Sequence, residues 1–337
     1  MTCDRRDFVL RSLFGAALVA GCSRQIHGGP FPSRDIDFVI PTGAGGGADV
    51  YARLIGSAME EHLPRQVNIV PLNVPSGGGG KGVTQLFRAA PDGYAIGILN
   101  IPGIFVLQRA RRMPYDLARF SWLGLVTEGE HYGLAFRASS PIRSIDQLRA
   151  LSHRRELTFS ASGPEGTGYS ATVIGTRLLG LRNRMVTGYK GSNDYVIGCM
   201  RGDSDAVVAA LSVIHRMQQG GQLRVLATFE EKSSLSGVPD ATSLGRPELA
   251  MITAERAIAA PPGLPAAERD ILAAALAKAG AEPKLVAFAK RIGERLNPQG
   301  PEQTEEIVRR KREFFDRFQV GHGIAMRSLT QESADAG

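Results

Sequence analysis

Three times along this chain, a short apolar run leads into a turn of glycines and other small residues, and each turn leads into a helical pattern. The first copy is VIPTGAGGGADVYARLIG (39–56), the second surrounds SGGGGKGV (76–83), and the third surrounds SASGPEGTGYS (160–170). Strands that alternate with helices through tight turns favour a parallel-rich sheet covered by helices on both faces. The sequence therefore predicts an α/β protein.

The remaining hydrophobic periodicity predicts two such α/β units and a helical C-terminal third. Ser144 is expected to cap the N-terminus of a helix over 144–151. Strands are expected at 37–41, 67–73, 94–100, 156–162, 205–211 and 223–229, and helices at 50–62, 170–179, 266–279, 283–292 and 303–318. With 337 residues, of which 43% are hydrophobic, the chain can form two cores of roughly 120–150 residues each.

The N-terminal 22 residues have the anatomy of an export signal. Arg5 and Arg6 precede a short apolar segment, as in a twin-arginine signal. Val-Ala-Gly-Cys at 19–22 resembles a lipobox, which favours Cys22 as a lipidated N-terminus after cleavage, followed by a tether over 23–33. A plain cleaved signal and a retained segment remain alternatives. Cys199 is the one cysteine left in the body of the chain, so no internal disulfide is expected there.

The glycine turns fit neither of two common nucleotide motifs. A dinucleotide fold needs an acidic residue at the end of the second strand, where this chain has Asn73. A phosphate loop needs Ser or Thr after its lysine, where Lys81 is followed by Gly82. What remains is a turn with little side-chain bulk at a helix N-terminus, which favours a bound anion. The alternative is that the glycines only permit tight strand–helix turns.

The sequence gives little support to other functions. The six histidines are dispersed, and neither a G-x-S-x-G elbow nor a metal-spaced histidine pair occurs. Net charge is +7, but the basic residues are scattered without interleaved aromatics, which argues against nucleic-acid binding. We therefore predict a protein that is not an enzyme and needs neither cofactor nor metal.

Residues 34–320 resemble the substrate-binding proteins of tripartite tricarboxylate transporters, the Bug receptor family. The resemblance starts with FVIPTGAGGGADVYARLIGSAMEEHL (38–63) and includes PDGY (91–94) and YKG (189–191). It implies a two-domain periplasmic-binding-protein (Venus flytrap) fold, each domain a mixed sheet flanked by helices, that closes on a small organic anion. Domain one is expected at 34–128 plus 256–325, with the C-terminal helices, domain two at 129–255, and a flexible tail at 326–337.

The resemblance also implies which residues bind the ligand. The first-domain loop would grip a carboxylate opposite the loop that opens the second domain's long helix, largely through backbone amides, hydroxyls and ordered waters. The residues carried over are Thr42, Ala44, Gly45, Gly46, Ala48, Asp49, Asn100, Ser162, Gly166, Thr167, Tyr169, Gly191 and Ser192. From its place in the first helical turn, we expect Asp49 to hold the turn, because its charge would repel an anion.

The chain departs from the family pattern at several of these positions. Tyr169 stands where His is common, Ala48 where Thr is usual, and Ala209-Ala210 where an Asp-Asn pair is frequent. The usual aromatic residue near the return crossover is replaced around 255–256. These changes lead us to expect a mono- or dicarboxylate that is less polar at its far end than the family's typical ligands.

The expected role is a monomeric solute receptor that hands an organic acid to a membrane permease and touches the membrane through its lipid anchor only. The alternative is a periplasmic sensor or partner-binding protein of the same fold that signals to a membrane regulator. An enzyme such as a hydrolase is a third class.

Overall fold

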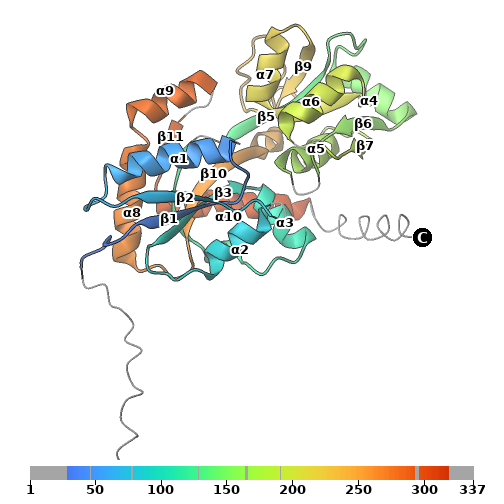
Figure 1. The fold of residues 1–337 in the computed structure, drawn as a ribbon. Coiled ribbons are helices and arrows are strands. Elements are labelled where there is room, and N and C mark those ends of the chain that lie inside the picture. The colour runs from blue at the N-terminus through green and yellow to red at the C-terminus, as the bar shows by residue number, and fades with distance from the viewer. Residues whose placement is uncertain are drawn as a thin grey trace, which may run out of the picture.

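The computed structural model of the protein describes residues 29–45, 47–76, 79–127, 129–163, 166–189, 191–292 and 296–318. These residues form two lobes, each a mixed sheet with helices packed on it (Figure 1). The lobes meet where strand β5 (Glu130–Arg137) pairs with strand β10 (Thr253–Ala260). The α/β class and the two-lobed architecture predicted from the sequence are confirmed.

The first lobe has a six-stranded sheet in the order β2-β1-β3-β10-β4-β11. Strands β1 and β2 are parallel, as are β1 and β3, whereas β10 runs antiparallel to β3. Besides β10, its strands are β1 (Ile36–Ile40), β2 (Ile69–Asn73), β3 (Ala95–Ile101), β4 (Ser121–Thr127) and β11 (Leu296–Gln299). The carboxyl ends of β1 and β3 therefore lie at one edge of the sheet, which is where ligands bind in open α/β sheets.

Two hydrophobic clusters cover the two faces of this sheet. One buries Ile36, Phe38 and Ile98 against α1 (Gly47–Glu60), α8 (Ala266–Ala279) and α9 (Pro283–Ile292). The other buries Val39 and Leu99 against α2 (Gly80–Arg88), α3 (Gly103–Ala110) and α10 (Pro301–Arg317). The C-terminal helices thus pack on the first lobe, although the strands and helices of the second lobe come between them and the rest of the first lobe in the chain.

The second lobe has a five-stranded sheet in the order β9-β5-β8-β6-β7. Its further elements are α4 (Ile145–Arg154), β6 (Leu157–Ser160), α5 (Thr167–Leu178), β7 (Asn183–Val186), α6 (Ser192–Arg201), β8 (Ala206–Ala210), α7 (Leu211–Gln219) and β9 (Leu223–Thr228). Ser144 caps α4 as predicted, since its hydroxyl accepts a hydrogen bond from the Gln147 amide. One hydrophobic cluster fills this lobe and also takes in Phe314 and Phe315 at the end of α10.

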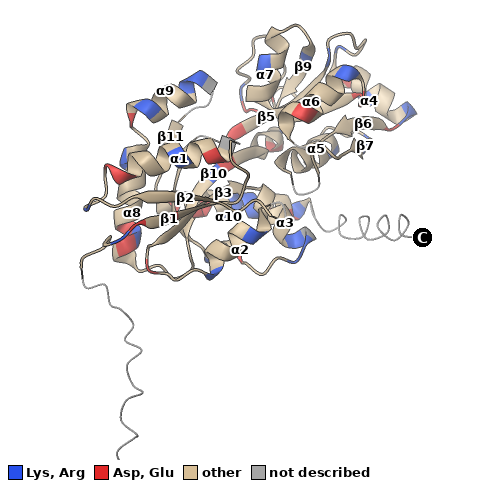
Figure 2. Cartoon of the chain, viewed as in Figure 1, with Lys and Arg blue, Asp and Glu red and all other residues tan. Residues whose placement is uncertain are grey.

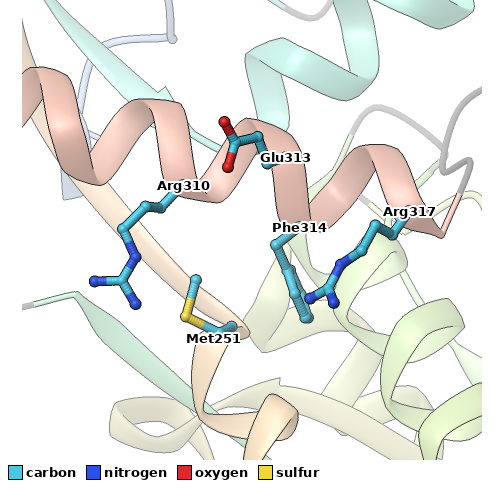
Figure 3. Close-up of a pocket in the computed structure, with 5 residues that line it drawn as sticks. All are labelled: Met251, Arg310, Glu313, Phe314 and Arg317. Atoms are coloured by element: carbon cyan, nitrogen blue, oxygen red, sulfur yellow. The ribbon is translucent and has the colours of Figure 1, made fainter.

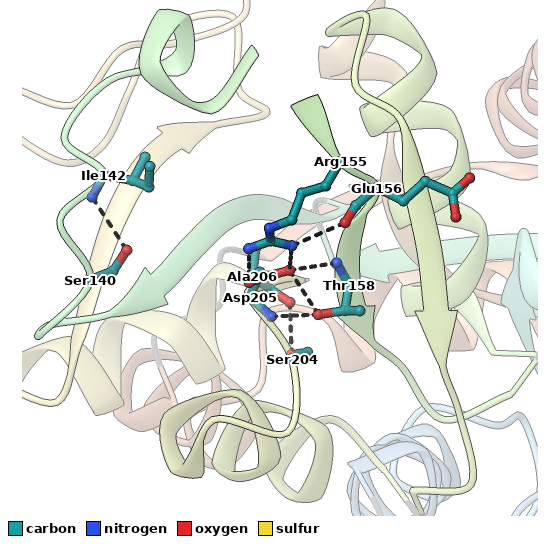
Figure 4. Close-up of polar contacts among 8 residues, drawn as sticks. All are labelled: Ser140, Ile142, Arg155, Glu156, Thr158, Ser204, Asp205 and Ala206. Atoms are coloured by element: carbon teal, nitrogen blue, oxygen red, sulfur yellow. Dashed lines mark hydrogen bonds and ion pairs between the residues drawn. The ribbon is translucent and has the colours of Figure 1, made fainter. Parts of the chain in front are cut away.

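A polar network fixes the start of β8 against β6 (Figure 4). The Asp205 carboxylate accepts two hydrogen bonds of 2.7 Å from Arg155, and further bonds from the Thr158 amide and hydroxyl. Burial raises the pKa of this carboxyl, but the bonds from Arg155 and Thr158 outweigh burial and bring its pKa to about 2. The network holds these neighbouring parallel strands in register at the edge opposite their carboxyl ends.

Several predicted elements agree closely with the structure, and others differ. Helices 266–279 and 283–292 have the predicted bounds. Helices α1 and α5 begin three residues before the expected 50 and 170, because glycines that we assigned to turns lie in their first turns. Strand β10 was not predicted. The export signal and the tail at 326–337 lie outside the described residues, and the domain limits stay predictions.

Candidate functional site

The turn between β1 and α1 is held together by a buried carboxylate. Asp49 accepts hydrogen bonds from the Gly45 amide at 2.8 Å, from Arg53 Nε at 3.0 Å and from Asn73 Nδ2 at 2.9 Å. The bond from Arg53 is the largest cause that lowers the pKa of Asp49, to about 2. The Asp49 carboxylate thus occupies the turn as an internal hydrogen-bond acceptor. The Gly45 amide, which we predicted to bind a ligand, donates to Asp49.

The same turn carries an unpaired polar atom. The Thr42 hydroxyl oxygen is buried and has no hydrogen-bond partner among the described residues, while the Thr42 carbonyl accepts from Asn73. Gly45 adopts a φ of +80°, which favours glycine, and the space beside its Cα is open. Ala44 is exposed and Ala48 is buried at the start of α1, whereas Gly46 lies outside the described residues.

The second glycine turn has a packing explanation. A Cβ atom on Gly79 would lie 2.6 Å from the Pro41 carbonyl oxygen, and one on Gly82 would lie 2.9 Å from the Val74 carbonyl oxygen. These glycines allow the start of α2 to pack directly on the turn after β1. For this turn, the alternative function of the glycines, which is to permit a tight connection between strand and helix, accounts for the contacts in the structure.

The third turn joins β6 to α5 and lies beside the turn before α6. The Ser162 carbonyl accepts a hydrogen bond of 2.9 Å from the Gly188 amide. Gly191 is the N-cap residue of α6, which starts at Ser192, and Gly166 is the N-cap residue of α5, which starts at Thr167. The structure therefore brings the predicted second-lobe residues to one edge, where parallel β6 and β7 end, with Tyr169 in the first turn of α5.

A row of five polar side chains crosses the junction between the lobes, and we call it the polar row: Asn100, Arg256, Glu130, Tyr132 and Thr167. Arg256 lies directly opposite Asn100 in the β10–β3 ladder, so both side chains point to the same face. Arg256 Nη2 is 3.5 Å from Glu130 Oε2. Glu130 and Tyr132 share a face of β5, and the Thr167 side chain lies close enough to the Tyr132 hydroxyl to offset a small part of the rise in its pKa.

Neighbouring residues hold the polar row in place. The Ser212 hydroxyl donates to Glu130, and the guanidinium of Arg256 lies over the Tyr51 ring, 4.8 Å from its centroid. Tyr132 is buried, which raises its pKa well above the ordinary value and keeps it a neutral hydroxyl. The other four members of the row are partly exposed. Between two sequence-predicted residues, Asn100 and Thr167, the polar row thus contains three residues that the site prediction omits.

The omitted residues gave only weak signals in the sequence. In the sequence, Arg256 marks a departure from the family pattern but carries no motif that indicates a site residue. Glu130 stands in a short polar stretch before the second unit, and Asn73 had served only to argue against a dinucleotide. Each gains its role from a partner that lies far away in the chain.

A pocket of about 410 Å³ lies away from these residues, between Met251 and α10 (Figure 3). Its lining residues are Met251, Arg310, Glu313, Phe314 and Arg317, none of them a predicted site residue.

Within the part of the chain that the structure describes, no group of three or more His, Cys, Asp or Glu side chains is arranged to hold a metal ion. None of the described helices has the length and apolar character needed to cross a membrane. Charges of both signs are spread over both lobes (Figure 2).

Comparison with known proteins places the chain among transport receptors. Residues 51–310 match the family model described as "Tripartite tricarboxylate transporter family receptor". The UPF0065 protein in the tcbD-tcbE intergenic region of Pseudomonas sp. (strain P51) is 26% identical over 316 residues, covering 91% of this chain and 92% of that protein.

Two solved structures show the same fold. An R. palustris protein with adipate has a TM-score of 0.70 and 24% identity, covering 87% of this chain and 98% of its own. MatC from Rhodopseudomonas palustris with bound malate has a TM-score of 0.69 and 20% identity, covering 86% and 99%.

Proposed function

Because this chain belongs to the tripartite tricarboxylate transporter receptor family, we propose that it is a periplasmic solute receptor. It binds a small organic carboxylate between its two lobes and delivers it to the membrane subunits of a tripartite transporter. Family membership rests on a match over residues 51–310. The dicarboxylates adipate and malate, each bound by a solved protein of the same fold, support this class of ligand.

The observation that carries the proposal is the polar row. It runs from a predicted residue of the first lobe, Asn100, to one of the second lobe, Thr167, and includes the ion pair between Arg256 on β10 and Glu130 on β5. A ligand that touches this row contacts both lobes at once. Such a ligand stabilises the closed arrangement by the difference between its affinities for the closed and the open forms.

The carboxylate would be held by neutral donors. The Thr42 hydroxyl lies buried and unpaired among the described residues, and a ligand oxygen would supply its partner. The Ser162 hydroxyl, in the turn after β6, and the Thr167 hydroxyl, at the start of α5, would bind from the other lobe, where the helix dipole favours negative charge. We propose the same role for the neighbouring Gly166, Tyr169, Gly191 and Ser192, and for the Gly46 amide. Asp49 acts by holding the turn.

We propose that the protein is exported through the signal at 1–22 and anchored by lipid on Cys22, with 23–33 as tether. The twin-arginine pair, Arg5-Arg6, supports export in the folded state. The lobe limits remain those proposed from the sequence, namely 34–128 plus 256–325 for the first and 129–255 for the second. A periplasmic sensor is the second candidate, and a sensor-kinase gene beside this one, in place of two membrane-subunit genes, would favour it.

The experiment that tests the proposal replaces Thr42 with Val, which has the same shape without the hydroxyl. Isothermal titration with adipate and malate should show binding to the wild type and about tenfold or more weaker binding to Thr42→Val, since a hydrogen bond to a charged group contributes about 1.5–3 kcal/mol. The unliganded variant should be as stable as the wild type or more so, because a buried unpaired hydroxyl is lost.

Thr304→Val is the matched control. Its hydroxyl is also buried, but it donates to the carbonyl of Gly300, the N-cap residue of α10. This variant should keep its ligand affinity. Equal affinity of wild type and Thr42→Val would refute the assignment of Thr42, and failure of the wild type to bind any carboxylate would refute the proposed function.

A further inference from the structure

Two opposite charges occupy the centre of the polar row. Glu130 and Arg256 lie 3.5 Å apart, and each side chain is 14% exposed, so neither is fully buried. Glu130 comes from the second lobe's strand β5, and Arg256 from the return strand β10 beside β3. The other predicted ligand contacts are glycines, alanines, hydroxyls and an amide, apart from the buried Asp49, whose carboxylate is occupied within its own turn.

The position of this pair is fixed from three sides. The Tyr51 ring supports the guanidinium of Arg256, and the Ser212 hydroxyl donates to Glu130. Ladder pairing of Arg256 with Asn100 and of Ala254 with Glu130 sets the backbone on both sides. The pair therefore presents a preorganised positive and negative group at fixed spacing, with Arg256 opposite the predicted site residue Asn100.

A ligand of one sign does not match this pair. A plain dicarboxylate is attracted by Arg256 and repelled by Glu130 at nearly the same distance, so the two effects offset each other. A ligand with an ammonium group beside its carboxylate can pair its positive group with Glu130 and its negative group with Arg256. Both contacts would be charge-assisted hydrogen bonds, which are shorter and stronger than neutral ones.

We propose that Glu130 and Arg256 are specificity-determining residues that select carboxylates carrying an adjacent ammonium group, that is, α-amino acids, over the corresponding plain acids. This inference rests on the proposed function, because it assigns a ligand class to the same site between the lobes. Glu130 recognises the ammonium group, and Arg256 recognises the carboxylate next to it.

The experiment measures affinity for matched pairs of acids that differ only in the ammonium group: succinate and aspartate, glutarate and glutamate, butyrate and 2-aminobutyrate. By isothermal titration, the wild type should bind the amino acid about tenfold or more tightly in at least one pair and never prefer the plain acid. Glu130→Gln keeps the shape but removes the charge, and it should abolish this preference. Arg256→Gln should weaken binding of both members of the pair.

Asp146→Asn is the control, since this carboxylate is 89% exposed on α4, and it should leave every affinity unchanged. If Glu130 were only structural, Glu130→Gln would weaken both members of a pair equally, which would overturn the inference. Tight binding of plain acids without any preference for amino acids would also overturn it while leaving the proposed function intact. If the wild type binds none of the six acids, the inference is overturned, whereas the proposed function falls only if adipate and malate do not bind either.

Discussion

Removal of the Lys311 ammonium group should destabilise the protein strongly, because the group lies in a buried polar cluster between α10 and the start of β10. Lys311 Nζ lies 2.8 Å from Glu255 Oε1. The same ammonium group donates a hydrogen bond of 2.7 Å to the Met251 carbonyl and another to the Thr253 hydroxyl. Both charged side chains are 6% exposed. Lys311→Met keeps most of the side-chain volume and leaves the Glu255 carboxylate buried without its positive partner.

The size of the effect follows from this burial. Removing one partner of a buried ion pair costs about 3–5 kcal/mol, because the remaining charge is uncompensated. In Lys311→Met the Thr253 hydroxyl still donates to Glu255 Oε1, but Glu255 Oε2 has no hydrogen-bond partner among the described residues, so one neutral donor is left to compensate the buried charge. Replacing both charges in Lys311→Met/Glu255→Leu should recover most of the loss, since a buried pair is often no more stabilising than apolar residues of similar volume.

Urea unfolding followed by circular dichroism would measure these free energies from the midpoint and slope of each transition. Arg309→Met on the same helix is the control, because its partners Glu306 and Glu313 are exposed, and its midpoint should stay close to that of the wild type. A loss below about 1 kcal/mol for Lys311→Met would refute the reasoning, because an uncompensated buried charge costs several times that. A double variant no more stable than the single one would refute the claim that the charge on Glu255 is the cause.

Two further predictions concern the second lobe and the N-terminus. Asp205→Asn should destabilise the protein by about 2 kcal/mol near neutral pH, since a carboxyl pKa of about 2 in the folded state lies well below its unfolded value. Because the folded pKa is depressed, this stabilisation is present above pH 4 and is lost as pH falls toward 2. The unfolding free energies of wild type and variant should therefore converge as pH falls toward 2. A difference between them that stays constant with pH would contradict the assignment. Cys22→Ser should release the protein from membranes in cell fractionation, and Arg5→Lys with Arg6→Lys should block export; membrane attachment that persists in Cys22→Ser would rule out the lipid anchor.

The sequence by itself determined those elements whose causes lie within a few residues. The cap at Ser144, the helices at 266–279 and 283–292 and the glycine turn after β1 follow from local hydrogen bonding, from 3.6-residue periodicity and from backbone freedom. The role of Asp49 as the residue that holds its turn was also predictable, because a first-turn carboxylate lies close to the amides before it.

The tertiary structure alone decided how the two halves of the site are joined. Strand β10 pairs with β3 and β5, which lie more than a hundred residues earlier. Its sequence, TAERAIAA, has two adjacent charged residues among small ones and shows no alternation of polar and apolar residues that would indicate a strand. The roles of Arg256, Glu130 and Asn73 depend on partners brought together by that pairing and by the packing of the loops after β1 and β2. The local sequence determines the preference of each segment for helix, strand or turn. A contact across the sheet forms only when strands distant in sequence align, and that alignment is a property of the folded chain.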